Sequence, residues 1–326
     1  MATGTYLDGI REALLEEMEA DPAVFLLGED IGLYGGAFKV TEGFLDRFGA
    51  DRVVDTPIAE SGIVGAAIGA SLLGLRPVAE MQFIDFIACA FDQITNFAAK
   101  MRWRTGVAVP IVIRGPSGGG VRGGPFHSQN PEVYYAHTPG LKVVQPATAA
   151  DAKGLLKAAI RDPDPVIYLE HKMLYRHPRL REELPGSDHV VPIGQAAVRR
   201  AGRDLSLITY GAMTLVCQDA ADTLAADGVS VEVLDLRTLL PLDREAIAAS
   251  VRKTGRALIV HEDTRTGGLA GEIAAILNEE VFEHLDAPIR RVTAPDTPVP
   301  YAASLEKAFL PDAERVVAAA RDLLSW

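Results

Sequence analysis

The chain has 326 residues, of which 48% are hydrophobic and 23% are charged, which is typical of a globular protein long enough for two hydrophobic cores. Its formal net charge of −12 argues against nucleic-acid binding, because a phosphate backbone requires a clustered basic face. The uncharged run from Ser61 to Leu75 is shorter than the roughly 20 residues of a membrane-spanning helix, and the acidic N-terminus has no signal-peptide stretch. We therefore expect a protein of the cytoplasm or of an organelle matrix, with Cys89 and Cys217 as buried free thiols.

Short aliphatic runs alternate with longer amphipathic runs in the first half of the chain, which is the pattern of strands and crossover helices in a parallel sheet. The first helix is indicated by Leu7, Ile10, Leu14 and Met18, which recur at helical spacing. The next predicted elements are a buried strand at 24–30, a helix of small residues after Glu60, a long helix over 83–101, a strand at 109–115, a glycine-rich loop at 115–132, a strand at 141–148, a helix at 149–162 with Thr148 as N-cap, and a strand at 164–171.

A second series of the same kind begins near Leu205. Its predicted elements are strands at 204–211, 229–236, 256–263 and 288–296, separated by helices that end near Asp227, Val251 and His284, with one more helix at the end of the chain. Between the two series lies a stretch rich in proline and charge, which indicates a linker. We therefore expect an α/β protein of two parallel-sheet domains, at 1–180 and 201–326, with the linker at 181–200.

Two familiar motifs overlap in the glycine-rich loop. Gly118, Gly120 and Gly123 satisfy G-x-G-x-x-G, and Gly115, Ser117 and Gly119 satisfy G-x-S-x-G. Both motifs require a helix that opens directly after them, whereas "GGPFHSQNPE" follows here, so we assign neither a phosphate site nor a serine nucleophile to the loop. The loop does deliver His127, which is either structural or a functional group at the end of a strand.

Glu60 is a single carboxylate at the head of an otherwise uncharged segment. An acid in the first turn of a helix is favoured by the macrodipole by about 0.3–1 kcal/mol. Since Asp55 or Thr56 can cap the helix instead, capping does not require Glu60, which leaves a chemical role open. The helix behind it carries small residues at spacings of three and four, which suits close packing against a partner element. These residues are Gly62, Gly65, Ala66, Gly69 and Ala70.

Gln82 and Phe86 follow in "EMQFIDF". Because they are four residues apart, they can share one face of a helix. An aromatic residue at such a site is more often part of the core than a platform for a ligand.

Taken together, several stretches resemble the β subunit of the thiamine-diphosphate-dependent first component of 2-oxo-acid dehydrogenase complexes. They include "LLGEDIGLYGGAFKVTEG", "DTPIAESGIVGAAIGASLLGLRPVAEMQFIDF", "HSQNPE" and "KTGRALIVHED", and the resemblance covers nearly the whole chain in order. It implies a transketolase-like pyrimidine-binding domain followed by a transketolase C-terminal domain.

The resemblance also implies roles for individual residues. Glu60 would hydrogen-bond a nitrogen of the cofactor's pyrimidine ring and favour its imino form, which takes the proton from the thiazolium carbon. Ile58, Gln82 and Phe86 would complete the pyrimidine site, with Phe86 stacked on the ring. His127 would stabilise substrate-derived intermediates and help proton delivery during acyl transfer to lipoamide.

A structural potassium site and a partner subunit follow from the same resemblance. The potassium ligands would be Ile111, Ala159, Ile160, Asp162 and Asp164, mostly through backbone carbonyls. The chain contains no Gly-Asp-Gly, the usual start of the signature that holds the cofactor diphosphate through magnesium. We therefore expect an α subunit to supply that half of the site in an α2β2 heterotetramer, with the small-residue helix face as a candidate junction, and the chain alone to be inactive.

The predicted function is oxidative decarboxylation of a branched-chain 2-oxo acid or pyruvate, with acyl transfer to the lipoyl group of the acyltransferase component. "EMQFIDF" and "HSQNPE" favour the branched-chain type, while "LEHKMLYR" and "LPLD" fit pyruvate or acetoin enzymes equally well. The alternatives are an acetoin dehydrogenase β subunit, a self-sufficient transketolase or deoxyxylulose-phosphate synthase relative, a hydrolase that uses Ser117, Asp235 and His261, and a docking subunit without catalytic function.

Overall fold

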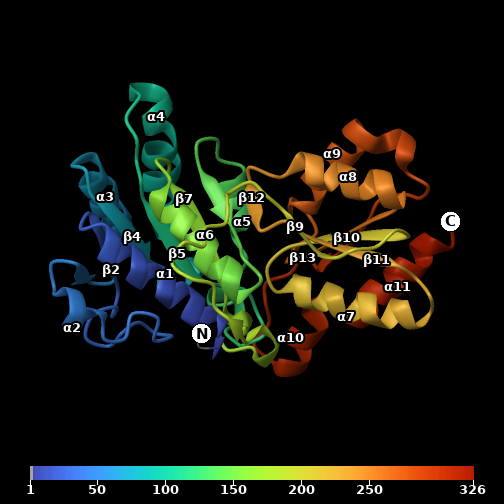
Figure 1. The fold of residues 1–326 in the computed structure, drawn as a ribbon, viewed down its shortest axis with the longest axis horizontal. Helices are drawn as coiled ribbons and strands as arrows, with labels where there is room; N and C mark the ends of the chain where they lie inside the picture. The colour runs from blue at the N-terminus through green and yellow to red at the C-terminus, as the bar shows by residue number, and fades with distance from the viewer. Residues whose placement is uncertain (1–2) are drawn as a thin grey trace. The chain divides into compact units, whose positions relative to one another are not determined.

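The computed structural model describes residues 3–326, which form two compact α/β units (Figure 1). The first unit comprises the chain up to Ser117 together with Tyr134–Ile193, and the second comprises Gly118–Val133 together with Gly194–Trp326. The boundary falls inside the predicted linker, at 193/194, and the linker range also contains the short strands β8 Glu182–Glu183 and β9 Ala197–Arg200. The glycine-rich loop belongs to the second unit, although the strand before it belongs to the first.

The first unit is built on a parallel sheet in the order β6-β7-β5-β4-β2-β3. Every residue of β5 and β7 is buried, because helices and loops cover both faces of such a sheet. Its strands are β2 Val24–Gly28, β3 Val53–Asp55, β4 Arg76–Glu80, β5 Val112–Ser117, β6 Lys142–Val144 and β7 Val166–His171, and β1 Thr3–Gly4 pairs antiparallel with β8.

Two helices of the first unit, α1 and α6, begin at side-chain caps. Thr5 and Asp8 form a capping box at the start of α1, and Thr148 accepts a hydrogen bond from the Asp151 backbone N–H at the start of α6. The helices are α1 Tyr6–Ala20, α2 Phe44–Phe48, α3 Glu60–Leu72, α4 Ala99–Thr105, α5 Glu132–Ala136, which crosses the boundary between the units, and α6 Ala149–Arg161, with 3-10 turns η4 Lys172–Leu174 and η5 Pro178–Leu180.

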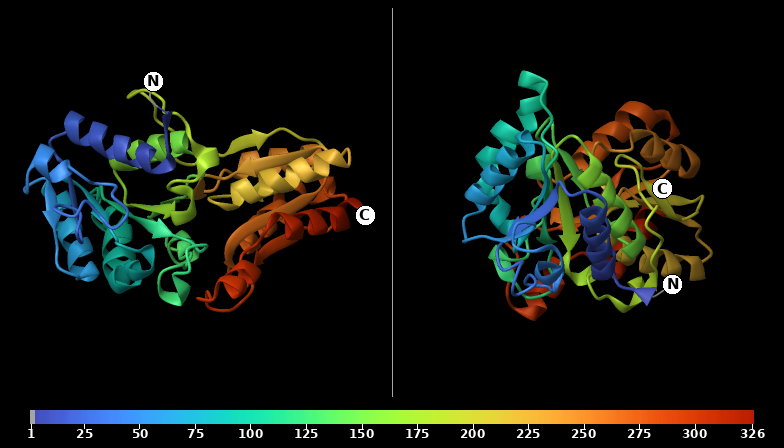
Figure 2. Two further views of the ribbon diagram at one scale, coloured as in Figure 1. Left: turned by 90° about the horizontal axis from the view of Figure 1, so that it is seen from below. Right: turned by 60° about the vertical axis from the view of Figure 1, so that its left-hand side comes forward.

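Helices α1 and α6 lie side by side (Figure 2) and are joined by ion pairs between buried lysines and more exposed glutamates. The Lys153 ammonium lies 2.7 Å from Glu16 and 2.9 Å from Glu12, and the Lys157 ammonium lies 2.5 Å from Glu16. Because both lysine side chains are at most 2% exposed, these pairs satisfy charges that would otherwise be costly to bury.

The long helix predicted over 83–101 is broken into three segments. A 3-10 segment, η1 Ile84–Ala90, is followed by a π-helical segment, η2 Gln93–Ala98, and then by α4. Gln82 precedes the first segment, so the prediction that it shares a helical face with Phe86 is wrong. Cys89 is exposed, contrary to its predicted burial, whereas Cys217 is buried as predicted, and burial raises the pKa of its thiol to about 12.

The second unit has a sheet in the order β14-β13-β10-β11-β9, parallel except for the antiparallel edge strand β9. Helices α8 and α9 pack together on one side of this sheet, and α7 and α11 on the other (Figure 1). Its elements are η3 Gly124–Phe126, β9, β10 Leu205–Thr209, α7 Met213–Ala226, β11 Val231–Asp235, β12 Thr238–Leu240, α8 Arg244–Thr254, β13 Ala257–Thr264, α9 Ala270–Val281, η6 Phe282–His284, β14 Arg290–Ala294, α10 Ala303–Phe309 and α11 Ala313–Leu324.

The α/β class with two sheets rich in parallel strands is thus confirmed. Across residues 3–326, we find no helix with the length and apolar character required to span a bilayer.

Candidate active site

The predicted pyrimidine-site residues of the first unit all follow the carboxyl ends of adjacent parallel strands. The register pairs Gly28 of β2 with Asp55 of β3 on one side and with Glu80 of β4 on the other. Ile58 and Glu60 therefore follow β3, and Gln82 and Phe86 follow β4, at one edge of the sheet. This edge is where open α/β sheets bind their ligands.

Glu60 is the first residue of α3 and is half-buried. Ala59 precedes it and makes no side-chain cap hydrogen bond, so the carboxylate stands at a helix start that has no other cap. A second carboxylate, Glu29, follows β2 and is only 7% exposed. Burial raises the pKa of Glu29, and the neighbouring charge of Glu60 raises it further. The structure thus brings two acids together where the sequence analysis singled out one.

Gln82 and Phe86 are half-buried, and Ile58 is 82% exposed. The Gln82 side-chain amide donates to the Asp30 carboxylate at 3.2 Å, which ties the segment after β4 to the segment after β2. Because Ile58 is so exposed, its apolar side chain is accessible to a ligand.

The small-residue face of α3 is open within the first unit. A Cβ added at Gly65 or Gly69 would meet nothing within 4 Å, and at Gly62 only Ala59 at 3.7 Å. The opposite face packs into the core through Ile63, Val64 and other buried residues. The glycines therefore serve no packing contact inside this unit.

His127 lies in the second unit, directly after η3. It is half-buried, and its backbone N–H donates to the Gly124 carbonyl at 3.4 Å. The loop that carries it begins with backbone amides that carboxylates bind: Gly119 N–H donates to Glu262 at 2.6 Å, and Gly120 N–H to Glu306 at 2.9 Å.

Beside this loop, a buried acidic cluster occupies the second unit. The Tyr210 hydroxyl donates to Glu132 at 2.9 Å. Burial and the charge of Asp263 raise the pKa of Glu132 well above its usual range, and burial raises the pKa of Asp263 to about 6. His261 stacks on Tyr210 with ring centroids 6.0 Å apart, and burial lowers its pKa to about 4.

Comparison with known proteins identifies both units. Residues 3–178 match the family described as "Transketolase, pyrimidine binding domain", and residues 194–316 match "Transketolase, C-terminal domain". The chain is 51% identical to the 2-oxoisovalerate dehydrogenase subunit beta of Bacillus subtilis (strain 168) and 46% identical to the pyruvate dehydrogenase E1 component subunit beta of the same organism, over the full length of each. The chain belongs to the E1 β subunits of 2-oxo-acid dehydrogenases.

A solved structure supports the fold of this E1 β subunit. It is described as "Split gene transketolase, inactive beta4 tetramer", and the match has a TM-score of 0.80 and 26% identity over 99% of both chains. The resemblance inferred from the sequence motifs is thus confirmed, and the chain is a component of a 2-oxo-acid dehydrogenase.

The residues predicted to bind potassium lie in the last turn of α6, in the segment between α6 and β7, and directly before β5 of the E1 β subunit. The Asp162 carboxylate accepts from the Lys142 ammonium at 2.6 and 2.7 Å, and Asp164 pairs with Arg102. The Ile160 carbonyl accepts from the Arg76 guanidinium at 3.0 Å. The Ala159 carbonyl accepts from the Asp162 N–H at 3.2 Å, and the Ile111 carbonyl accepts from the Val166 N–H at 3.0 Å. A carbonyl oxygen has two lone pairs, so each retains one for a cation. No group of three or more His, Cys, Asp or Glu side chains suited to a metal occurs in residues 3–326. The potassium site stays a prediction.

The contacts of Asp235 and Ser117 do not match the hydrolase alternative. Asp235 accepts from Arg199 Nε and Nη2 at 3.0 and 2.8 Å, so arginine and not histidine is its partner. Ser117 is fully buried at the end of β5. These contacts exclude the arrangement in which an aspartate orients a histidine beside an accessible serine.

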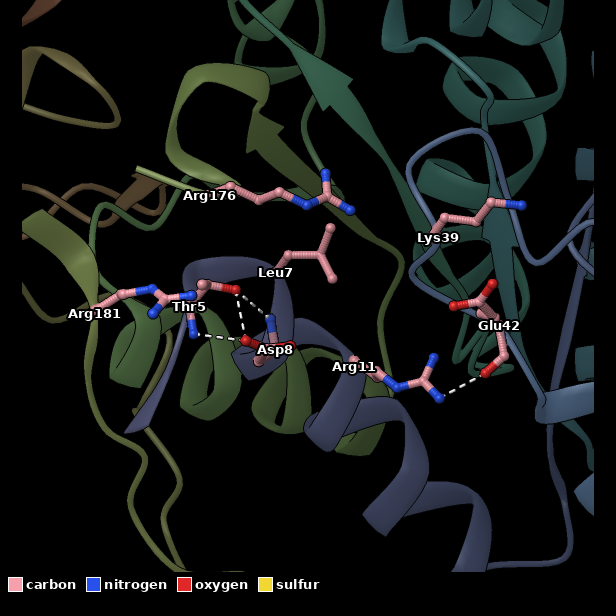
Figure 3. Close-up of a pocket in the computed structure, with 8 residues that line it drawn as sticks. All are labelled: Thr5, Leu7, Asp8, Arg11, Lys39, Glu42, Arg176 and Arg181. Atoms are coloured by element: carbon pink, nitrogen blue, oxygen red, sulfur yellow. Dashed lines mark hydrogen bonds between the residues drawn. The ribbon is translucent and has the colours of Figure 1, made fainter. Parts of the chain in front are cut away.

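A separate hollow of about 400 Å³ in the first unit is lined by basic side chains (Figure 3). Arg11 donates to the carbonyls of Val40 and Glu42, and Arg176 donates to the carbonyl of Phe38 at 2.9 Å. Arg11 thus fixes the segment that follows Asp30 to α1, and Arg176 fixes it to the turn between η4 and η5. None of the predicted site residues lines the hollow.

Sequence analysis missed Glu29, Glu262 and Glu306. Glu29 lay in the string "GED", which ends a predicted strand, and a carboxylate at the carboxyl end of a parallel strand was the available signal. Glu262 and Glu306 carry no local signal, because their partners are 143 and 186 residues away in the sequence.

Proposed function

We propose that this E1 β subunit takes part in the thiamine-diphosphate-dependent oxidative decarboxylation of a branched-chain 2-oxo acid or pyruvate, with acyl transfer to the lipoyl group of the acyltransferase component. The observation that carries the proposal is the position of Glu60. It is a half-buried carboxylate at an uncapped helix start, at the carboxyl edge of the sheet, beside the buried Glu29. The names of the relatives support both substrate types.

The residues at this edge fit the aminopyrimidine end of thiamine diphosphate. Glu60 would hydrogen-bond a nitrogen of the pyrimidine ring, donating from the carboxyl oxygen that holds the proton. Phe86 would present a ring face, and Ile58 would cover the apolar side. Gln82 donates to Asp30 in the structure and retains its carbonyl oxygen as an acceptor. The bound cofactor supplies a nucleophilic carbanion. A shielded carboxylate is suited to this task, because its electrostatic interaction strengthens as water is excluded.

His127 is proposed to act at the substrate end. Its half-buried imidazole, on a loop whose backbone is held by carboxylates, would stabilise substrate-derived intermediates and deliver a proton to the sulfur that leaves when the lipoyl disulfide takes up the acyl group. Histidine is the side chain whose ordinary pKa suits such transfer near neutral pH.

An α subunit is proposed to supply the magnesium and diphosphate half of the site in an α2β2 heterotetramer. The chain has no Gly-Asp-Gly, and the open glycine face of α3 begins at the candidate site itself. Large apolar side chains are also exposed on this unit, with Leu73 86% and Trp103 96% exposed, which favours burial against a second polypeptide. The solved relative described as an inactive β4 tetramer supports the expectation that the chain alone is inactive.

The test is reconstitution. The purified chain is mixed with the matching α subunit, thiamine diphosphate and magnesium, and release of labelled carbon dioxide is measured across a panel of 2-oxo acids. We expect release only when both subunits and the cofactor are present. A folded complex without thiamine-dependent release from any 2-oxo acid would contradict the proposal and favour a docking subunit.

We also propose that potassium binds at the residues predicted for it at the end of α6 and before β5. If it does, potassium raises the thermal unfolding midpoint of the complex above that in choline chloride of equal ionic strength, because a ligand bound only by the native state stabilises it. The effect is expected to shrink in Asp162→Asn. Equal midpoints in the two salts would remove potassium from the account.

A further inference from the structure

The glycine-rich loop forms a concave surface of backbone amides. Gly118, Gly120 and Arg122 adopt left-handed backbone conformations, with φ of +79°, +86° and +61°. Alternation of such residues with ordinary ones turns successive N–H groups toward one side, which creates an anion-binding concavity. This geometry explains why the sequence reads as a phosphate-binding motif although no helix follows.

Two glutamates of the same unit already fill this concavity. Glu306 of α10 accepts from Gly120 N–H at 2.9 Å and from Arg122 N–H at 3.1 and 3.2 Å. Glu262 of β13 accepts from Gly119 N–H at 2.6 Å. Both glutamates are buried, at 4% and 5% exposure, so these hydrogen bonds are largely shielded from water.

The same contacts close the loop on both sides of His127. Glu262 also accepts from the Asn130 side-chain amide at 2.9 Å, and Gly118 N–H donates to the Gln129 carbonyl at 3.0 Å. One carboxylate thus ties the residues before His127 to those after it.

Packing makes the loop specific for glycine at its contact points. A Cβ on Gly119 would lie 3.1 Å from the Leu310 side chain, one turn along from Glu306. A Cβ on Gly124 would lie 2.2 Å from the Tyr301 ring. The loop therefore lies close against α10 and the segment before it.

We propose that Glu262 and Glu306 are positioning residues for His127: they act as internal anions that hold the histidine loop in one conformation for acyl transfer. The inference rests on the proposed role of His127. It also implies that the G-x-G-x-x-G amides bind no phosphate, because the protein's own carboxylates occupy them.

The experiment compares Glu306→Leu, which removes both acceptor oxygens, with Glu306→Gln, which retains one. Glu314→Leu is the matched control, because Glu314 is exposed on α11 of the same unit. The reconstituted α–β complex is assayed for decarboxylation with an artificial electron acceptor and for acyl transfer to a lipoylated domain. Amide hydrogen exchange of residues 118–130 is followed in the same samples.

We expect Glu306→Leu to reduce acyl transfer by about 10- to 100-fold, in line with the cost of misplacing a catalytic group by about 1 Å. Decarboxylation should fall by less than about threefold, because the first unit is unchanged. The loop amides of Glu306→Leu should exchange faster than those of the wild type. Glu306→Gln should give rates between those of Glu306→Leu and the wild type, and Glu314→Leu should match the wild type. If Glu306→Leu does not assemble with the α subunit, the acyl-transfer rate and the loop amide exchange of Glu306→Gln provide the test instead.

A double-mutant cycle separates this inference from the function on which it rests. If Glu306 acts through His127, the pair Glu306→Leu with His127→Ala loses no more acyl transfer than His127→Ala alone. Additive losses, or unchanged loop exchange in Glu306→Leu, would overturn the positioning role. An unchanged rate in His127→Ala would instead overturn the proposed role of the histidine itself.

Discussion

Glu60 and Glu29 show how the sheet edge makes carboxylates interact. Each follows a neighbouring parallel strand, so their proximity is a consequence of the β2–β3 register and not of sequence spacing. Burial raises the pKa of Glu29, and the charge of Glu60 contributes to the same shift.

Replacement of Glu60 by glutamine is therefore expected to lower the pKa of Glu29, because the neighbouring negative charge is removed. Titration of carboxyl carbons by NMR in glutamate-labelled protein measures the shift. Glu42→Gln is the control, since Glu42 is an exposed acid of the same unit. A Glu29 pKa that stays constant in Glu60→Gln would show that the two carboxylates do not interact.

His261 makes the second unit sensitive to acid. Because burial depresses its folded-state pKa to about 4, below its usual 6.5, the neutral form is the one the fold accommodates. The neutral His261 therefore contributes fully to the free energy of unfolding above pH 6.5. This contribution is lost as the pH falls toward 4, and the total loss is about 3 kcal/mol at most. Asp263, whose pKa is raised to about 6, acts with the opposite sign, since its ionisation disfavours the fold as pH rises.

Because these two effects oppose each other, the contribution of His261 to the pH dependence of stability is measured by comparing variants. His261→Gln should lose less free energy of unfolding between pH 6.5 and 4 than the wild type, as measured by urea unfolding at each pH. His284→Gln, at an exposed histidine of the same unit, should behave like the wild type. Equal losses in His261→Gln and the wild type would refute the assignment.

Among the elements, β4, β5 and β7 share a buried ion network beneath the candidate site. Arg114 donates to Glu170 at 2.5 and 2.8 Å and pairs with Glu80, while the Tyr175 hydroxyl donates to Glu170 at 2.7 Å. Burial opposes the charge of Arg114, but the two carboxylates outweigh it and raise its pKa well above the usual value. For Glu80, burial prevails over Arg114 and raises the carboxyl pKa.

Arg114→Met should accordingly destabilise the first unit by about 3–5 kcal/mol, because it leaves two buried carboxylates without their partner. Arg104→Met, at an exposed arginine of α4, should have little effect. Urea midpoints of the two variants test this, and similar midpoints would mean that the network contributes little to the fold.

The open glycine face of helix α3 is predicted to contact the α subunit. Gly69→Leu should leave the isolated chain folded, because nothing lies within 4 Å of the new Cβ, and should abolish association with the α subunit. Gly271→Leu is the matched control, a helical glycine of α9 that is equally open. Analytical ultracentrifugation of the mixtures measures assembly; normal association of Gly69→Leu would exclude this face as the junction.

For the whole molecule, the sequence predicted the strands that form continuous aliphatic runs, because these are buried on both faces. It did not predict β3, which has three residues, or β4, which begins with Arg-Pro, because neither forms such a run. It did not predict the broken helix between Ile84 and Thr105, because its 3-10 and π segments depend on packing against α3. Nor did it predict that the glycine-rich loop belongs to the second unit, because that depends on contacts with Glu262 and Glu306 far along the chain.

Glu60 is proposed to activate the cofactor in a site completed by another polypeptide. The most direct test is the rate of carbon dioxide release from a labelled 2-oxo acid by the reconstituted α–β complex carrying Glu60→Gln, beside the Glu42→Gln control. We expect normal assembly and cofactor binding, with carbon dioxide release reduced by at least about 100-fold, as for loss of an essential acid–base group. Release at the wild-type rate by an assembled, cofactor-loaded Glu60→Gln complex would contradict it.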